Sequence, residues 1–107
     1  LSGEYGGPRT ASYAASKAGV MSLTHCLARF LGDRMINVNC LSPGVIQNEF
    51  TAKTMSPTVK KLAKNLMIIK RLGKIDDLKG ASVFLASKDS DYMTGQTISV
   101  NGGAWVR

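Results

Sequence analysis

Two short apolar segments, residues 35–41 and 96–100, are separated by a long stretch with helical patterning. The expected order of elements is helix, strand, loop, helices and strand. Strands separated by helices belong to a parallel sheet, because parallel neighbours need a long crossover connection. Such a sheet is covered on both faces and needs more than two strands. We therefore predict a single α/β domain of 107 residues that supplies part of a parallel sheet and does not fold stably alone.

The first half of the chain predicts one long helix followed by one strand. The helix is expected over residues 11–31, with Thr10 or Ser12 as its cap. The strand is expected over residues 35–41, and it ends at the serine, proline and glycine of residues 42–44. Apolar residues recur along the helix at helical spacing and are expected to form a buried stripe: Val20, Leu23, Leu27, Phe30 and Leu31.

The second half predicts two helices and a final strand. The serine and proline at 56–57 favour a helix start. The acidic pair at 76–77 suits the first turn of the next helix, because negative charge is favourable at that end of the helix dipole. The last strand is expected over residues 96–100, with a tight turn at 101–103. The apolar residues that follow the first of these helix starts are Val59, Leu62, Ala63, Leu66 and Met67.

A tyrosine and a lysine stand four residues apart near the start of the first helix. Positions i and i+4 share one face of a helix, so Tyr13 and Lys17 are expected to be neighbours. A nearby cation favours the phenolate and lowers the pKa of a tyrosine from its ordinary value of about 10. A tyrosine tuned in this way can exchange a proton with an alcohol or a carbonyl oxygen. The alternative is a helix start with one tyrosine and one solvated lysine, and the spacing alone does not exclude it.

Four segments together resemble the classical short-chain dehydrogenase/reductase family, of the type that includes the 3-oxoacyl-carrier-protein reductases. Residues 13–19, with the sequence Tyr-Ala-Ala-Ser-Lys-Ala-Gly, are similar to the Tyr-x-x-x-Lys segment of that family. Residues 36–44 resemble its sixth strand and the Pro-Gly turn that follows. Residues 76–87 resemble its last long helix, and residues 94–103 its seventh strand and C-terminal turn. The four segments agree with the family in order and spacing.

The resemblance implies a Rossmann-type doubly wound parallel sheet and an oxidoreductase that moves a hydride between NAD or NADP and a carbonyl or alcohol substrate. Tyr13 would be the acid in reduction and the base in oxidation, and Lys17 would assist Tyr13 and bind the nicotinamide ribose. Backbone groups of Ile46 would hold the carboxamide. Asn48 stands where the family usually has threonine, and an amide can still donate and accept hydrogen bonds. The implied catalytic residues are Tyr13 and Lys17, and the implied cofactor-binding residues are Tyr13, Lys17, Pro43, Gly44, Ile46 and Asn48.

The family pattern is incomplete within these 107 residues. No glycine-rich phosphate loop is present in the sequence, and the catalytic serine of the family would fall just ahead of Leu1, with Ser2 as its neighbour. Residues 1–107 are therefore expected to be the C-terminal part of one Rossmann-fold oxidoreductase domain. Two alternatives stay open: a relative that binds a ligand or partner without catalysis, and a fragment that is inactive on its own.

The net charge is +7, and lysines and arginines gather between residues 53 and 79. Such a cluster can attract nucleic acid, an acidic membrane surface or an anionic ligand, or it can be a solvated face. No aromatic residue is interleaved with the cluster, which disfavours binding of single-stranded nucleic acid. No apolar run reaches the length of a membrane span. We expect a cytoplasmic protein with a small-molecule substrate and without nucleic-acid or membrane partners.

Cys26 and Cys40 are the only cysteines, and neither has the spacing of a metal ligand. We expect both to be buried free thiols in a reducing compartment, His25 to be an ordinary helix residue, and no metal site. The apolar tail around Trp105 indicates either a subunit interface or packing within its own chain. The family resemblance implies a homodimer or a homotetramer.

Overall fold

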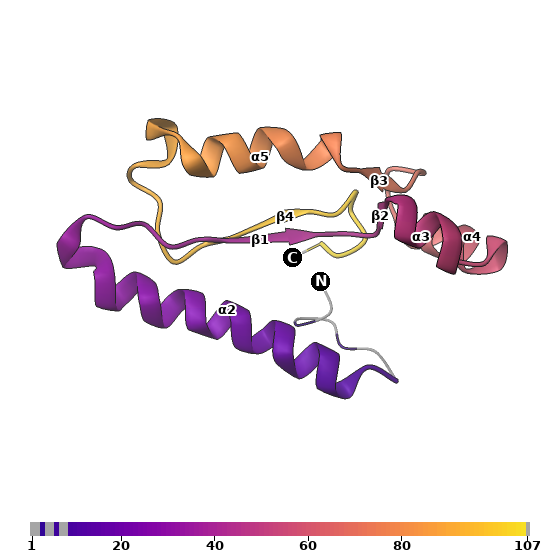
Figure 1. The fold of residues 1–107 in the computed structure, drawn as a ribbon, viewed down its shortest axis with the longest axis horizontal. Helices are drawn as coiled ribbons and strands as arrows, with labels where there is room; N and C mark the ends of the chain where they lie inside the picture. The colour runs from indigo at the N-terminus through magenta and orange to yellow at the C-terminus, as the bar shows by residue number, and fades with distance from the viewer. Residues whose placement is uncertain (1–2, 4–5, 7–8, 107) are drawn as a thin grey trace.

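A computed structural model describes residues 3, 6 and 9–106 of the chain. Its main elements form three layers, with α5 (Asp76–Ala86) on one face of a two-stranded sheet and α2 (Ala11–Leu31) on the other (Figure 1). The sheet pairs β1 (Cys40–Pro43) with β4 (Thr97–Val100) in parallel. The predicted α/β class, with parallel strands covered by helices on both faces, is therefore confirmed.

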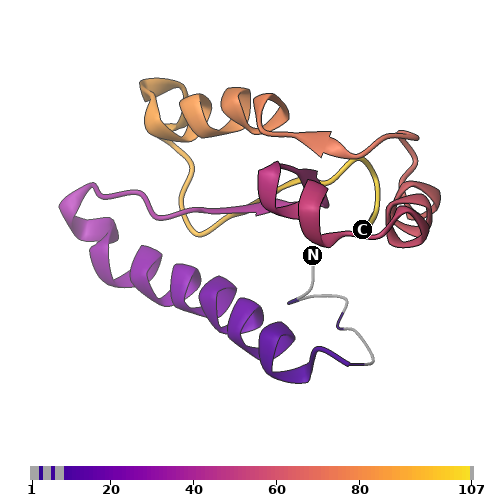
Figure 2. The ribbon, with the colours of Figure 1, turned by 45° about the vertical axis from the view of Figure 1, so that its right-hand side comes forward.

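A second, smaller sheet was not predicted from the sequence. It pairs β2 (Ile46–Gln47) in parallel with β3 (Gly73–Lys74), so that Ile46 lies opposite Gly73. The helices α3 (Glu49–Thr54) and α4 (Pro57–Leu66) connect these two strands and lie beyond the carboxyl end of β1 (Figures 1 and 2). The described residues also contain two short 3₁₀ turns, η1 (Gly32–Arg34) and η2 (Lys88–Ser90).

The first helix has the predicted bounds, but its cap and its buried face differ from the prediction. Thr10 occupies the cap position without a side-chain capping hydrogen bond. The residues that α2 buries are Thr24 and Ala28, because small side chains allow the helix to approach the sheet and the Gly95 loop closely. The predicted stripe lies to the side of this contact. Within the described part of the chain, four of its members are exposed: Val20, Leu23, Leu27 and Phe30.

The first strand begins later than predicted, because asparagine side chains replace strand pairing over its expected first half. Asn37 Nδ2 donates to the carbonyls of residues 90 and 91, and Asn39 Nδ2 donates to the Met93 carbonyl at 2.8 Å. Asn39 Oδ1 also accepts from the Gln96 backbone N–H at 3.0 Å. These bonds tie residues 36–39 to the loop that leads into β4. Regular pairing therefore starts only at Cys40.

The buried core is small and lies next to the carboxyl ends of β1 and β4. Ala63, Met67 and Leu72 form one buried cluster, with Val45 and Ala104 packed against it. The other apolar residues of the predicted α4 stripe are exposed: Val59, Leu62 and Leu66. The core thus supports the chain that leaves β1 and the turn that follows β4.

Local signals in the second half are largely confirmed. Ser56 caps α4 by accepting from the Val59 backbone N–H at 3.3 Å, and a proline occupies the first turn. The acidic pair at 76–77 lies in the first turn of α5. The final strand is one residue shorter than expected, and the turn after it uses positive φ at Gly102 (62°) and Gly103 (79°). Glycine adopts this conformation without steric cost.

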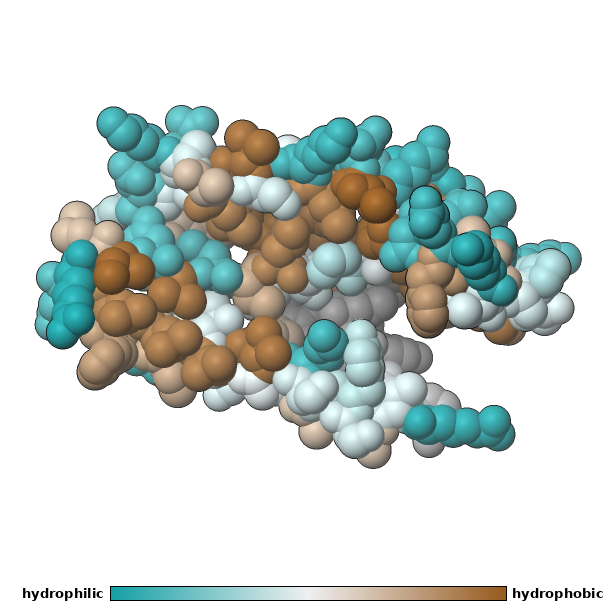
Figure 3. All heavy atoms as spheres, viewed as in Figure 1, coloured by the Kyte–Doolittle hydropathy of each residue, from teal (hydrophilic) through white to brown (hydrophobic). Residues whose placement is uncertain are grey.

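Apolar side chains gather on the face seen in Figure 3, over the C-terminal half of α2 and between α5 and the sheet. Cys26 is exposed on α2, contrary to the prediction, because it faces away from the Ala28 contact, while Cys40 is half-buried; both thiols are free.

Among the residues that the structure describes, no helix has the length and apolarity needed to cross a bilayer. The predicted loop over residues 1–10 lies largely outside the described residues.

Candidate active site

The first turns of α2 bring Tyr13 and Lys17 together as their spacing predicts. The Lys17 Nζ lies 5.2 Å from the centroid of the Tyr13 ring. This distance is typical of a cation over an aromatic face. The Tyr13 side chain is 52% exposed within this chain. The phenol is therefore accessible to a ligand and has a cation beside it.

The turn at Gly44 is built where the two parallel strands end. The Gly44 backbone N–H donates to the Val100 carbonyl at 3.0 Å, which continues the pairing of β1 with β4. A Cβ on residue 44 would lie 2.7 Å from the Asn101 Cα, closer than real Cβ contacts. Glycine is thus required at this position by the turn after β4. Open α/β sheets bind ligands at this edge, beyond the carboxyl ends of the strands.

One cavity of about 460 Å³ joins the helix start to this turn. Tyr13 and Lys17 line it from α2, and residues 40–45 line it from β1 and the turn. The structure therefore brings together four of the residues singled out in the sequence: Tyr13, Lys17, Pro43 and Gly44. Cys40 and Ser42 also line the cavity, although no spacing in the sequence pointed to them.

Ile46 and Asn48 lie outside this cavity. Ile46 lines a neighbouring cavity of about 160 Å³ that shares Gly44 and Val45 with the first. Asn48 caps α3: its Oδ1 accepts from the Thr51 backbone N–H at 2.8 Å, and its own N–H donates to Thr51 Oγ1 at 2.8 Å. The Asn48 side chain thus has a structural role, and its expected cofactor contact stays a prediction.

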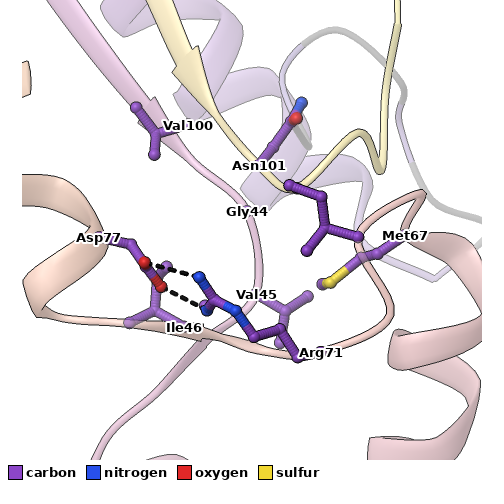
Figure 4. Close-up of a pocket in the computed structure, with 11 residues that line it drawn as sticks. Gly44, Val45, Ile46, Met67, Arg71, Asp77, Val100 and Asn101 are labelled. Atoms are coloured by element: carbon purple, nitrogen blue, oxygen red, sulfur yellow. Dashed lines mark hydrogen bonds and ion pairs between the residues drawn. The ribbon is translucent and has the colours of Figure 1, made fainter.

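The smaller cavity contains a charged pair that sequence reasoning missed (Figure 4). Arg71 donates to both carboxylate oxygens of Asp77, from Nη1 at 2.6 Å and from Nη2 at 2.8 Å. The Lys74 backbone N–H donates to the same carboxylate at 2.7 Å. The hydrogen bonds from Arg71, and then the one from Lys74, hold the pKa of Asp77 far below its ordinary value. The carboxylate in turn raises the pKa of Arg71.

Within the residues that can be described, no three histidine, cysteine, aspartate or glutamate side chains lie close enough together to hold a metal ion. The polar groups of the site are instead a phenol, an ammonium, a hydroxyl, a thiol and backbone amides. Such groups bind and orient organic ligands and transfer protons.

The sequence of the chain is similar to those of known reductases over nearly its full length. Residues 1–104 match the family model described as "Enoyl-(Acyl carrier protein) reductase". The 3-oxoacyl-acyl-carrier-protein reductase of Staphylococcus epidermidis is 41% identical over 104 residues, which is 97% of this chain and 42% of that protein. The reductase of the same name from Thermotoga maritima is 40% identical over 101 residues, or 94% of this chain and 41% of that protein.

Solved structures give the same picture of the fold. A glucose/ribitol dehydrogenase of the short-chain type from Brucella melitensis superposes with a TM-score of 0.89 at 33% identity, covering 100% of this chain and 43% of that one. A putative 2-deoxy-D-gluconate 3-dehydrogenase from Agrobacterium tumefaciens was solved with bound NADP. It superposes with a TM-score of 0.89 at 36% identity, covering 95% of this chain and 42% of that one. The chain thus spans about two fifths of the length of the proteins it matches.

Proposed function

The chain belongs to the short-chain dehydrogenase/reductase family, and from this premise we propose that it carries part of the active site of an NAD(P)-dependent oxidoreductase. The reaction is hydride transfer between a nicotinamide and a carbonyl or alcohol carbon. The chain acts as the C-terminal part of one Rossmann-fold domain, with the phosphate loop and the substrate-orienting serine in a preceding segment. The observation that carries the proposal is the single cavity lined by Tyr13, Lys17, Pro43 and Gly44.

The cavity fits one end of a dinucleotide. Its volume of about 460 Å³ lies within the range of roughly 300–1,000 Å³ that is usual for small-molecule sites. It opens at the carboxyl ends of parallel strands, where nucleotides bind in this fold class. The related dehydrogenase solved with NADP supports NADP or NAD as the ligand here. When bound, the nicotinamide supplies or accepts the hydride.

Tyr13 is assigned the proton transfer. In reduction its phenol donates a proton to the substrate carbonyl oxygen, so the phenolic O–H bond breaks as the O–H bond of the alcohol forms. In oxidation the phenolate removes that proton. The Lys17 ammonium, 5.2 Å from the ring centroid, stabilises the negative charge left on the phenol and binds the nicotinamide ribose. Tyr13 and Lys17 thus act together from the same face of α2.

The turn after β1 is assigned the nicotinamide. Gly44 and Pro43 would line the nicotinamide site, and backbone groups of Ile46 would bind the carboxamide. Gly44 is already fixed by its hydrogen bond to Val100, so this part of the site is pre-organised for a flat ligand. Asn48 is assigned only a secondary contact with the cofactor, because its Oδ1 already accepts a hydrogen bond from the Thr51 backbone N–H in the capping box.

The test is Tyr13→Phe in the native protein, with turnover and cofactor affinity measured separately. We expect turnover to fall by about 10²–10⁴-fold, the usual contribution of general acid–base catalysis, while NADH or NADPH still binds. Tyr92→Phe is the matched control, because Tyr92 is fully exposed and lies outside the cavity. Retained turnover in Tyr13→Phe would remove Tyr13 from the mechanism. Absent cofactor binding in the unmodified protein would point instead to a non-catalytic relative.

The substrate class is proposed only as a carbonyl or its alcohol. The relatives with similar sequences are named for 3-oxoacyl-acyl-carrier-protein, and the solved relatives are named for glucose or ribitol and for 2-deoxy-D-gluconate. Assays of nicotinamide oxidation with a 3-oxoacyl thioester and with a keto sugar acid separate these classes. The basic residues between 53 and 79 support an anionic substrate or carrier.

For assembly and location, we propose a cytoplasmic homodimer or homotetramer. The exposed apolar side chains of α2 support an interface, and the two free thiols are consistent with a reducing compartment. Sedimentation of the native protein would contradict the assembly if it gave a monomer. Cell fractionation tests the location.

A further inference from the structure

Arg71 and Asp77 form the most closely connected charged pair among the described residues. Two parallel hydrogen bonds join their planar groups, and Arg71 Nη1 also donates to the Leu72 carbonyl at 3.1 Å. The other ion pair, between Lys79 and Asp76, has a single short contact, and both of its side chains are more than 70% exposed. Bidentate arginine–carboxylate pairs fix geometry as well as charge. The pair can therefore hold the chain segment between its two members in one conformation.

That segment contains β3, and β3 is paired with the strand that follows the Gly44 turn. Asp77 accepts from the Lys74 backbone N–H, so the carboxylate closes the loop at the end of β3. The Gly73 backbone N–H donates to the Val45 carbonyl at 3.0 Å. A Cβ on residue 73 would lie 2.5 Å from the Ile46 Cδ1, so the two strands are in close contact. A displacement of β3 is thus transmitted directly to Val45 and Ile46.

The turn at residues 44–46 is too short to absorb a displacement of β3, because it is fixed at both Gly44 and Val45. At Gly44 it is fixed to β4 by the hydrogen bond to Val100 and by contact with the Asn101 backbone. At Val45 it is fixed to β3. Gly44 and Val45 line the smaller cavity together with Arg71 and Asp77 (Figure 4). The same two residues also line the larger cavity, together with Tyr13 and Lys17.

We propose that Arg71 and Asp77 are positioning residues that hold the Gly44–Ile46 turn in the shape that contacts the nicotinamide of the cofactor. The inference rests on the proposed function, since it assigns a support to the turn that binds the nicotinamide. It makes a specific claim about the ligand: the pair affects the nicotinamide end of the dinucleotide and leaves the adenosine end unaffected. A general loss of structure would weaken both ends.

The experiment compares two ligands in the native protein: reduced NAD or NADP, and the corresponding ADP-ribose, which lacks the nicotinamide. For Asp77→Asn we expect the dissociation constant of the reduced cofactor to rise about tenfold, the equivalent of one hydrogen bond to a charged group. Affinity for the ADP-ribose should stay unchanged. Arg71→Lys keeps the positive charge but cannot form two parallel bonds, so it should produce a smaller rise in the same direction.

Asp76→Asn is the matched control, because Asp76 is the neighbouring aspartate on the same helix turn and its ion pair among the described residues is with exposed Lys79. It should change neither affinity. Three outcomes would overturn the inference. Asp77→Asn could weaken the binding of both ligands equally, it could weaken neither, or Asp76→Asn could have the same effect as Asp77→Asn. If Asp77→Asn does not fold, Arg71→Lys decides the question in the same two assays. Failure of the unmodified protein to bind any nicotinamide dinucleotide would overturn the proposed function itself.

Discussion

The Gly44 turn and the start of α2 form opposite sides of one cavity, and the chain holds them in different ways. The turn is bonded to β4 and β3 and rests on the buried cluster of Ala63, Met67 and Leu72. Among the described residues, α2 buries only Thr24 and Ala28, and most of its larger apolar side chains are exposed. Near Lys17 its backbone is in close contact with Gly3. The side of the cavity formed by the Gly44 turn is thus organised by contacts within the described residues. The side that carries Tyr13 has fewer buried side chains among the described residues.

The largest expected effect concerns the isolated 107-residue chain. Its described buried hydrophobic residues are few, and each sheet in the described part has only two strands, fewer than independent stability requires. We expect far-UV circular dichroism to show a broad thermal change without a cooperative transition. Amide hydrogen exchange should be faster in α2 than in β1 and β4. A sharp and reversible melt would contradict the prediction, and equal protection of the two regions would remove the contrast between them.

In the native protein, Met67→Ala should have the next largest effect. The Met67 side chain is 2% exposed and supports the Gly44 turn through the buried cluster. Removal of such a side chain costs about 2–5 kcal/mol of unfolding free energy through lost burial and the cavity left behind. Chemical denaturation measures it.

Leu66→Ala is the control for this substitution, because Leu66 is the preceding residue and is 71% exposed. Its cost should stay within about 0.5 kcal/mol, as for most surface positions. Similar costs for both variants would show that the core does not support the turn in the way described.

Gly44→Ala tests the turn directly. The added Cβ would lie 2.7 Å from the Asn101 Cα, and backbone cannot rotate away as a flexible side chain can. Overpacking of this kind costs about 1–3 kcal/mol of unfolding free energy, and the moved turn should also weaken cofactor binding. Differential scanning calorimetry and cofactor titration give the two values.

Gly19→Ala makes the same change on α2, at a position where the described residues leave room for a Cβ. Apart from its chain neighbours and the backbone of its own helix, no described atom lies within 4 Å of a Cβ at residue 19, and alanine is a better helix former than glycine by about 1 kcal/mol. We therefore expect a gain in stability of up to that size. A loss would mean that another backbone approaches α2 at this point in the native protein, which would sharpen the comparison by identifying what supports the helix.

Sequence reasoning succeeded where the signal is local. The bounds of α2 and the cap of α4 depend on residues within one or two turns, and both were predicted. The start of β1 was misplaced because the partners of Asn37 and Asn39 are more than fifty residues away in the sequence. The Arg71–Asp77 pair spans only six residues but becomes visible only once β3 has paired with β2.

The smallest expected effect is the pH dependence of the Arg71–Asp77 pair. The bond to Arg71 lowers the pKa of Asp77 in the folded protein, so the folded carboxyl holds its proton less tightly than the unfolded one. Its contribution to stability is therefore complete above the unfolded pKa of about 3.9 and is lost as the pH falls through the lower folded value. The effect is small because both side chains are partly exposed and screened by solvent.

The stability difference between the native protein and Asp77→Asn should thus be constant from neutral pH down to about pH 5 and should shrink in stronger acid, where both carry a neutral side chain. Urea denaturation over this range measures the difference, and Asp76→Asn provides the baseline for an exposed carboxylate of the same helix turn. A difference that grows toward acid pH would mean that Asp77 is protonated in the folded protein. The turn would then be held by its backbone bonds to β4 and β3 and by the buried cluster, and the contrast between the two sides of the cavity would not rest on charge.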